Sequence, residues 1–273
     1  MRASRVAGFE VPAGGQQNTS SSDLIGTAGA GEGRVWSLAA SADRVAAACG
    51  DRTVRVYSLR DDWALQLNDG KRRCWAVALN RDGARLAASS AGNIVRVWEL
   101  PSGEKLWERC AHDGRIRSVA SDDSGGLLLT GGGDGQARLW QLPAGDKTGE
   151  FTHGPSWVRS VALDGSGARI ALGCGPGVIY VHDVGSGQVA AELHGHNGRV
   201  LMLGFCPDPD VLVSAAADGT IRLWSLSGQK QVAEVRVDAS LQAAGLDAAR
   251  RTVLAASAAG TVAVRIPMVS EER

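Results

Sequence analysis

The chain has 273 residues, of which 44% are hydrophobic and 21% are charged, a composition that can build a globular core. Its 29 basic and 29 acidic residues cancel, which argues against a polycationic nucleic-acid-binding chain or a membrane-surface protein. The five cysteines form no Cys-x-x-Cys pair, and no apolar run has the length of a secretory signal or a membrane span. We therefore expect a cytoplasmic protein with free thiols that does not enter a membrane.

The first 28 residues contain two short strand-like stretches. "SRVAGFEVPAGG", residues 4–15, has the pattern of a strand and turn, similar to "NIVRVWELPSGE" at 93–104. "GGQQNTSSS", residues 14–22, has the composition of a flexible linker, and "DLIGTA", residues 23–28, is a second candidate strand. We expect residues 1–22 to be an N-terminal extension and residues 23–273 to be one repeat domain.

Six segments of that domain share one pattern: "GRVWSLA" from Gly33, "RRCWAVA" from Arg72, "GRIRSVA" from Gly114, "SWVRSVA" from Ser156, "GRVLMLG" from Gly198 and "ASLQAAG" from Ala239. Their shared apolar residues recur at spacings of 39, 42, 42, 42 and 41 residues. Each unit alternates apolar and polar residues in short runs separated by turn clusters, and none has helical periodicity. This period predicts an all-β propeller with repeats near 33–72, 73–113, 114–155, 156–197, 198–237 and 238–268.

The second halves of four units carry a resemblance to a known family. "ACGDRTVRVYSL", "SSAGNIVRVWEL", "TGGGDGQARLWQL" and "SAAADGTIRLWSL" resemble the WD-repeat β-propellers. The resemblance implies a buried network of His, Ser or Thr, Asp and Trp in each complete repeat. Two repeats have all four residues: His112, Thr130, Asp134 and Trp140, and His196, Ser214, Asp218 and Trp224. The other repeats are partial, with Asp51 and Tyr57, Trp98, Pro176 and His182, and Ala259 and Arg265 at the corresponding places.

The same histidines suggest two other kinds of site, which the resemblance makes improbable. His196, Ser214 and Asp218 have the composition of a hydrolytic triad, but they stand at structural positions of the family. "HGH" at 194–196 has no third ligand at zinc spacing. We therefore expect no catalytic residues, no metal and no cofactor.

Closure of the ring depends on the first 28 residues. In WD-repeat proteins the last blade is usually completed by a strand from the other end of the chain. We expect six blades, closed by an N-terminal strand at residues 23–28, which would be the fourth strand of the sixth repeat. The alternative is seven blades, one of them incomplete, with residues 4–15 as a third strand.

The resemblance also implies where a partner would bind. In this family the first strand of each blade is innermost, and the residues on either side of its first apolar position lie at the top rim of the central channel. Before that position stand Arg34, Arg73, Arg115, Trp157, Arg199 and Ser240. After it stand Trp36, Trp75, Arg117, Arg159, Leu201 and Gln242. We call these twelve residues the rim. A third contact position holds only small residues: Gly50, Ala91, Gly133, Gly175, Ala217 and Ala258.

Nine of the twelve rim residues are arginine or tryptophan: Arg34, Trp36, Arg73, Trp75, Arg115, Arg117, Trp157, Arg159 and Arg199. Arginine presents a planar fork to carboxylates and phosphates, and tryptophan gives a large rigid contact area. We expect a non-enzymatic scaffold or sensor module that binds a protein or acidic peptide at this face, with its oligomeric state left open. The alternative is binding of nucleic acid or polyphosphate by the same residues, against which the balanced charge and the lack of a lysine cluster argue. A structural explanation is that the arginines only solvate the channel and stack on the indoles.

Overall fold

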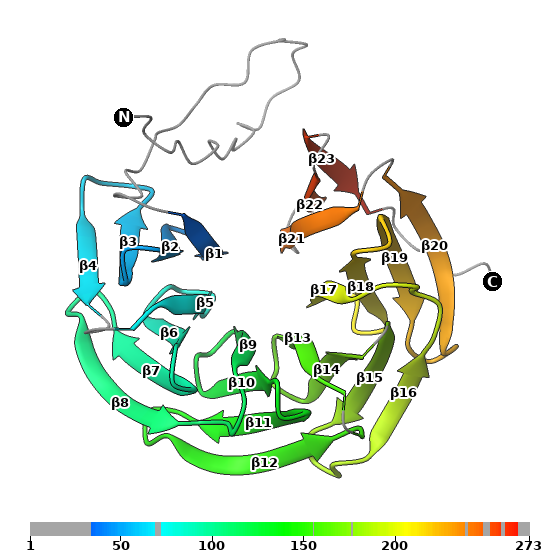
Figure 1. Cartoon of the computed structure of the whole chain (residues 1–273), viewed down its shortest axis with the longest axis horizontal. Coiled ribbons are helices and arrows are strands. Elements are labelled where there is room, and N and C mark those ends of the chain that lie inside the picture. The colour runs from blue at the N-terminus through cyan, green and yellow to red at the C-terminus, as the bar shows by residue number, and fades with distance from the viewer. Residues whose placement is uncertain are drawn as a thin grey trace.

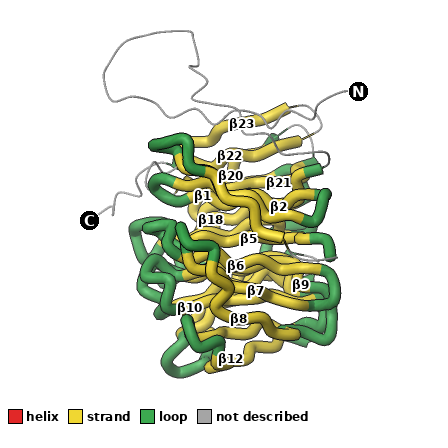
Figure 2. Tube along the Cα trace, turned by 90° about the vertical axis from the view of Figure 1, so that its left-hand side faces the viewer, coloured by secondary structure: helices red, strands yellow, loops and turns green. Residues whose placement is uncertain are grey.

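Six antiparallel sheets stand around a central axis as the blades of a propeller (Figure 1). The computed structural model describes residues 34–68, 72–154, 156–175, 177–237, 240–247, 252–257 and 260–266. Within these ranges every regular element is a strand, and no helix could cross a membrane. The strands run between the two faces of the disc, and the turns gather at those faces (Figure 2). The predicted all-β fold with six repeats is confirmed.

Blades 1 to 5 each have four strands in chain order, and blade 6 has three. Blade 1 comprises β1 (Val35–Ala40), β2 (Arg44–Cys49), β3 (Thr53–Ser58) and β4 (Ala64–Asn68). Blade 2 comprises β5 (Cys74–Leu79), β6 (Arg85–Ser90), β7 (Ile94–Glu99) and β8 (Glu104–Cys110). Blade 3 comprises β9 (Ile116–Ser121), β10 (Leu127–Gly132), β11 (Gln136–Gln141) and β12 (Asp146–Thr152).

Blade 4 comprises β13 (Val158–Leu163), β14 (Arg169–Cys174), β15 (Val178–Asp183) and β16 (Val189–Leu193). Blade 5 comprises β17 (Val200–Phe205), β18 (Val211–Ala216), β19 (Thr220–Ser225) and β20 (Lys230–Arg236). Blade 6 comprises β21 (Leu241–Asp247), β22 (Thr252–Ser257) and β23 (Gly260–Arg265). The first strand of each blade begins at the shared apolar residue of its repeat.

Tight Asp-Gly turns join the second and third strands of blades 3 and 5. Gly135 and Gly219 have φ values of 81° and 82°, a backbone region that glycine adopts without the strain that a side chain would add. The preceding aspartates accept hydrogen bonds from the backbone N–H of Gln136 and Thr220, at 3.2 and 3.0 Å. Each turn therefore fixes the position of a carboxylate at the end of the blade.

The apolar core lies between the blades. Val158 and Val161 of blade 4, for example, are buried in one cluster with Leu129 and Leu139 of blade 3. Each inner blade buries side chains of both its faces against its two neighbours, so stability comes from nearest-neighbour contacts between repeated units. In strand β13 the buried Val158 and Val161 make these core contacts, while Arg159 between them is left out of the ladder of paired residues.

Arginines at the start of second strands tie neighbouring blades together on the face opposite the rim. Arg44 and Arg85 each donate from Nη1 to a backbone carbonyl of the next blade, at Gly83 and Gly125. Arg169 does the same to Pro209 at 2.7 Å. This repeated bond satisfies a turn carbonyl and holds adjacent blades in register.

Blades 1 and 6 stand at the two ends of the series. The first strands pack against one another in chain order from β1 to β21 (Figure 1). The closing strand that we expected at residues 23–28, and the alternative third strand in residues 4–15, lie outside the described residues.

Candidate functional site: a rim of arginine and tryptophan

The rim residues lie where the innermost strands β1, β5, β9, β13, β17 and β21 begin. In blades 1 to 5 the carbonyl of the first rim residue accepts the backbone N–H of the small third-position residue, at 2.6 to 3.2 Å. The donors are Gly50, Ala91, Gly133, Gly175 and Ala217. Ala258 lies outside the described residues. The small residues thus stand beside the rim and leave its side chains uncovered.

The second rim residue of every blade is the extra residue of a β-bulge. In blade 1, Val35 pairs with Cys49 and Ser37 pairs with Ala48, so Trp36 has no partner in the ladder. The other five blades leave out the equivalent residues Trp75, Arg117, Arg159, Leu201 and Gln242. A bulge bends its strand and re-aims the unpaired side chain. The backbone therefore presents these six side chains by the same device.

Tryptophans and arginines of blades 1 to 3 stack in a continuous arc. The guanidinium carbon of Arg34 lies 5.1 Å from the ring centre of Trp36, which meets Trp75 edge to face at 5.1 Å. Arg115 of blade 3 lies 4.5 Å from the Trp75 ring centre. These contacts bridge neighbouring blades and hold the rings in place.

A second stack joins blades 3 and 4. Arg117 lies 4.9 Å from the ring centre of Trp157, whose side chain is 55% exposed. Trp36 is 38% exposed, and Trp75 is half-buried. All three predicted rim tryptophans are therefore at least partly open to solvent, and Trp157 presents the most apolar surface.

Four arginines from blades 3 to 5 lie close enough to repel one another. Burial lowers the pKa of Arg117, and the positive charges of Arg115 and Arg199 lower it further. The pKa of Arg159 is lowered by burial and then by Arg117, Arg199 and Arg115. In the part of the chain that the structure describes, no rim arginine forms an ion pair with a carboxylate. The cluster therefore has no internal counter-charge, a property that favours an anionic ligand.

The other rim residues are more scattered. Arg73 of blade 2 and Ser240 and Gln242 of blade 6 are exposed, and Leu201 of blade 5 is half-buried. The Ser240 hydroxyl donates to the carbonyl of Ala217 at 2.7 Å. Blade 6 therefore adds polar but uncharged side chains to the rim.

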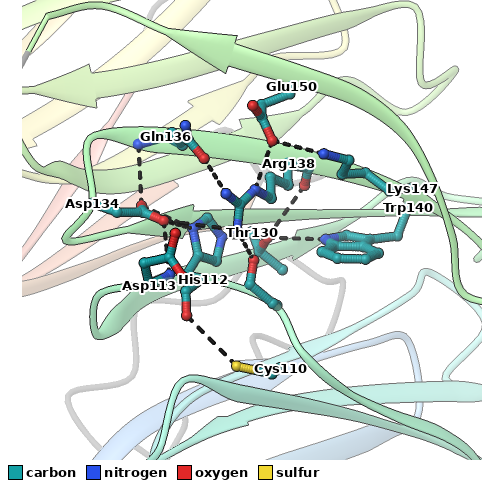
Figure 3. A network of polar contacts seen from close by, with 11 residues as sticks. Cys110, His112, Asp113, Thr130, Asp134, Gln136, Arg138, Trp140, Lys147 and Glu150 are labelled. Atoms are coloured by element: carbon teal, nitrogen blue, oxygen red, sulfur yellow. Dashed lines mark hydrogen bonds and ion pairs between the residues drawn. The ribbon is translucent and has the colours of Figure 1, made fainter.

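Blade 3 contains a complete buried polar network (Figure 3). His112 Nδ1 lies 2.9 Å from Asp134 Oδ1, and His112 Nε2 lies 2.8 Å from Thr130 Oγ1. Trp140 Nε1–H donates to the same hydroxyl oxygen at 3.0 Å. Burial is the main cause that lowers the pKa of His112, so the ring is neutral, with Nδ1–H donating to the carboxylate and Nε2 accepting from the hydroxyl.

Blade 5 repeats the network with serine in place of threonine. His196 lies 3.0 Å from Asp218 and 2.7 Å from Ser214, and Trp224 Nε1–H donates to Ser214 Oγ at 2.8 Å. The serine oxygen is buried and accepts a tryptophan N–H. This hydroxyl is part of the fold and is not placed as a nucleophile.

Several hydrogen bonds hold the carboxylate of Asp218 in its charged form. Burial acts to raise the pKa of Asp218. The hydroxyl and backbone N–H of Thr220, the backbone N–H of Asn197 and the His196 ring outweigh that effect and lower the pKa to about 2. The network thus fixes the start of β17, because the backbone N–H of Asn197, two residues before the rim residue Arg199, donates to Asp218.

Third-strand arginines make a different kind of contact from the rim arginines. Arg96, Arg138 and Arg222 pair with the glutamates opposite them on the fourth strands, Glu108, Glu150 and Glu234, at 2.9, 2.9 and 3.1 Å. Arg55 of blade 1 pairs with Asp51 at 2.7 Å. Because their charges are matched inside each blade, these arginines support the fold and contribute little to a binding surface.

A histidine pair between blades 3 and 4 was missed by sequence reasoning. His182 stands at the tryptophan position of its repeat, and its Nε2 contacts Nε2 of His153, which stacks on Tyr180 at 3.7 Å. His182 Nδ1 lies 3.2 Å from the carbonyl of Gly187. If Nδ1–H donates to that carbonyl, Nε2 of a neutral His182 is left to accept from His153. The only sequence signal was the replacement of tryptophan by histidine.

Acid is expected to destabilise the fold from about pH 6.5 downwards. Burial is the first cause that lowers the pKa of His112, His153, His182 and His196 below 6.5. As pH falls, the unfolded chain therefore binds protons before the folded chain does. The contribution of the neutral histidines to the free energy of unfolding is complete above pH 6.5. It is lost below pH 6.5, by up to about 1.4 kcal/mol per pH unit for each neutral histidine. Thermal unfolding between pH 7.5 and 5.5 measures the effect, and His153→Gln should reduce the pH slope. An unchanged melting temperature over this range would contradict the buried neutral histidines.

No group of three potential metal ligands is brought together within the described ranges. His194, which belongs to the "HGH" stretch, is exposed and pairs with Glu192 at 2.9 Å. His196 is already engaged by its network. The two histidines of this stretch therefore make different contacts: His194 pairs with Glu192 at the surface, and His196 belongs to the buried network of blade 5.

Known proteins match three parts of the chain. The family model "WD domain, G-beta repeat" matches residues 66–99, 103–141 and 187–225. Periodic tryptophan protein 2 of Saccharomyces cerevisiae is 45% identical over 56 residues, which cover 20% of this chain and 6% of the relative. Human pre-mRNA-processing factor 19 is 40% identical over 58 residues, 21% of this chain and 12% of the relative.

A third relative is transcription initiation factor TFIID subunit 5 of Drosophila melanogaster, 48% identical over 44 residues, or 16% of this chain and 6% of the relative. The chain thus spans no more than 12% of the length of these three relatives. The sequence similarity therefore extends over 44 to 58 residues of each relative and not over the whole protein. The repeat matches and the six blades together show a β-propeller that contains three WD repeats.

Proposed function

We propose that the chain is a non-enzymatic binding module whose rim recognises an acidic peptide segment of a protein partner. The observation that carries this proposal is the cluster of Arg115, Arg117, Arg159 and Arg199, in which burial and the neighbouring positive charges lower the pKa values of Arg117 and Arg159. No carboxylate among the described residues pairs with this cluster. A carboxylate-bearing ligand would relieve that repulsion and receive planar, two-pronged hydrogen bonds. Trp157 beside the cluster supplies apolar contact area, and Trp and Arg are enriched among the few residues that carry most of the binding energy of interfaces.

The stacking pattern favours a peptide over a nucleic acid. Bases bind through free aromatic faces, but Trp36 and Trp75 are already in contact with each other and with Arg34 and Arg115. The name of the Drosophila relative describes a subunit of a larger factor, which also supports a role in assembly. Nucleic-acid binding is the second candidate because Trp157 remains exposed between arginines.

The free thiols of all five cysteines support our proposal of a reducing, cytoplasmic location.

An affinity capture tests the face and the class of partner together. Wild type is compared with the Trp157→Ala, Arg159→Ala double variant and with a control, Val189→Ala, Arg236→Ala, which removes an exposed apolar residue and an exposed arginine from outer strands. If the proposal is right, wild type and the control variant capture one or more proteins in the presence of nuclease, and the rim variant does not capture them. Loss of those proteins on nuclease treatment would favour the nucleic-acid candidate, and equal capture by all three forms would contradict the rim as the site.

Salt should weaken binding of a glutamate-rich peptide to the rim. Exposed charges are screened over a Debye length that shrinks from about 10 Å at 0.1 M salt to about 3 Å at 1 M. Fluorescence anisotropy should therefore show affinity falling about tenfold or more across that range, mainly through slower association. A lysine-rich peptide of equal length is the control and should not bind. Salt-independent binding would mean that the arginines are not the contact.

A further inference from the structure

Blade 4 lacks the carboxylate that holds the connection into the innermost strand of blades 3 and 5. In blade 3, Asp134 accepts the backbone N–H of Asp113 at 3.1 Å, directly after the network histidine. In blade 5, Asp218 accepts that of Asn197 at 2.9 Å. Blade 4 has Pro176 at the corresponding place in the sequence, which offers no side-chain acceptor. The connection from β12 to β13 must therefore be held by other contacts.

The side chain that holds this connection is His153. It directly follows β12, and its Nε2 lies 2.5 Å from Nε2 of His182 on β15. Among the described residues between 153 and 157, this is the one side-chain hydrogen bond. At the other end of the connection, the carbonyl of Trp157 accepts the backbone N–H of Gly175 at 3.2 Å. The connection is therefore fixed by a histidine pair at its start and by the backbone at the rim.

A second difference places this pair beside a carboxylate that has no arginine. Tyr180 stands opposite Glu192 in the strand ladder, where blades 2, 3 and 5 have an arginine opposite a glutamate. Glu192 pairs instead with the exposed His194 at 2.9 Å, and His153 stacks on the Tyr180 ring. Among the described residues, His182 and Glu192 are the charges that act on His153. Blade 4 therefore has titratable rings where the other blades have a permanent cation.

The histidine pair can hold one added proton but not two. In the neutral pair, Nδ1–H of His182 donates to the carbonyl of Gly187, which leaves its Nε2 to accept Nε2–H of His153. A first proton on Nδ1 of His153 preserves that bond. A second proton on Nε2 of His182 would set two N–H groups and two positive charges against each other, so the rings must separate. Burial lowers the pKa of both rings, and Phe151 packs on His182 without adding a charge, so the pair separates only in acid.

We infer that His153 and His182 form an acid-sensitive latch, which fixes Trp157 at the rim while the pair is intact and releases it when both rings are protonated. The effect on a ligand rests on the proposed function, because Trp157 stacks with Arg117 of the arginine cluster at 4.9 Å. Release of the connection takes the apolar surface of Trp157 away from the bound peptide and frees the stacked arginine. The rim therefore holds its acidic partner at neutral pH and releases it in acid.

Peptide affinity at two pH values tests the latch. Wild type and His153→Gln are titrated with the glutamate-rich peptide at pH 7.5 and pH 5.0, with circular dichroism to verify the fold at each pH. The amide of Gln can donate or accept, so it keeps its contact with His182 in either protonation state. Between the two pH values wild type should lose about fivefold more affinity than His153→Gln, the lower end of usual couplings between sites. His194→Gln removes an exposed histidine outside the pair and should respond to pH as wild type does.

Hydrogen exchange follows the latch without a ligand. The amides of Gly154, Ser156 and Trp157 should exchange faster in wild type than in His153→Gln at pH 5.0, and at equal rates at pH 7.5. If peptide affinity had the same pH dependence in both forms, the inference would be overturned while the proposed function stood, provided that both forms bind at pH 7.5. Failure of both forms to bind at pH 7.5 would contradict the proposed function, and equal exchange at pH 5.0 would overturn the latch itself.

Discussion

The Arg117→Glu, Arg159→Glu double variant is expected to bind a glutamate-rich peptide about 100-fold more weakly than wild type. Truncating one member of a buried charged pair costs about 2–5 kcal/mol, and 100-fold corresponds to about 2.7 kcal/mol. Both arginines are partly buried at bulge positions, so their charges act on a ligand with less screening than at an open surface. Anisotropy at low salt gives the affinity, and stopped-flow mixing gives the association rate.

The melting temperature of this variant separates a binding role from an architectural one. Because Arg115, Arg117, Arg159 and Arg199 repel one another, removing two positive charges should leave the fold as stable as before or more stable. The control Arg222→Gln breaks the pair with Glu234 and should destabilise the fold while peptide binding persists. If the rim variant had a lower melting temperature than wild type and bound the peptide with full affinity, the rim arginines would have only a structural role.

Asp218→Ala is expected to cost about 1–3 kcal/mol of folding free energy. The substitution removes the acceptor of the backbone N–H groups of Asn197 and Thr220, and it leaves the Nδ1–H of His196 with only the Thr220 hydroxyl, 3.0 Å away. An unmade buried hydrogen bond is costly. For a domain of this size each kcal/mol shifts the melting temperature by about 2–4 °C. Differential scanning calorimetry measures the shift.

Two further variants calibrate that result. Asp134→Ala removes the equivalent carboxylate of blade 3 and should cost a similar amount, because its bonds to His112, Asp113 and Gln136 match. Asp146→Ala removes an exposed aspartate at the start of β12 and should change little. Equal stability of Asp218→Ala and Asp146→Ala would mean that the network contributes nothing.

The repeating sequence pattern predicted the strands, and the resemblance to WD-repeat proteins predicted the two networks. The apolar residue that begins each first strand, such as Val158, recurs with a near-constant spacing, and Asp134 and Asp218 follow the same turn pattern. Contacts between blades are harder to predict, because they join residues about 40 positions apart through side-chain shape. The stacking of Arg115 on Trp75 and the pairing of His153 with His182 are contacts of this kind.

The exposure of Leu38 and Leu254 on the two end blades could also not be predicted from the sequence. Leu38 and Leu254 have the same hydrophobic character as their buried equivalents, so the sequence pattern gives no indication that their faces are open. Only the placement of the blades distinguishes them.

The bulges give the rim a freedom that the rest of each blade lacks. Trp36, Trp75, Arg117, Arg159, Leu201 and Gln242 are outside the strand ladders, so a different side chain at any of them leaves the backbone pairing intact. Mutation can therefore explore new ligands at these six places while selection on the core keeps the ring unchanged. Descendants of one ancestral propeller would diverge fastest there, and grafting six residues onto a stable relative is a direct route to a new specificity.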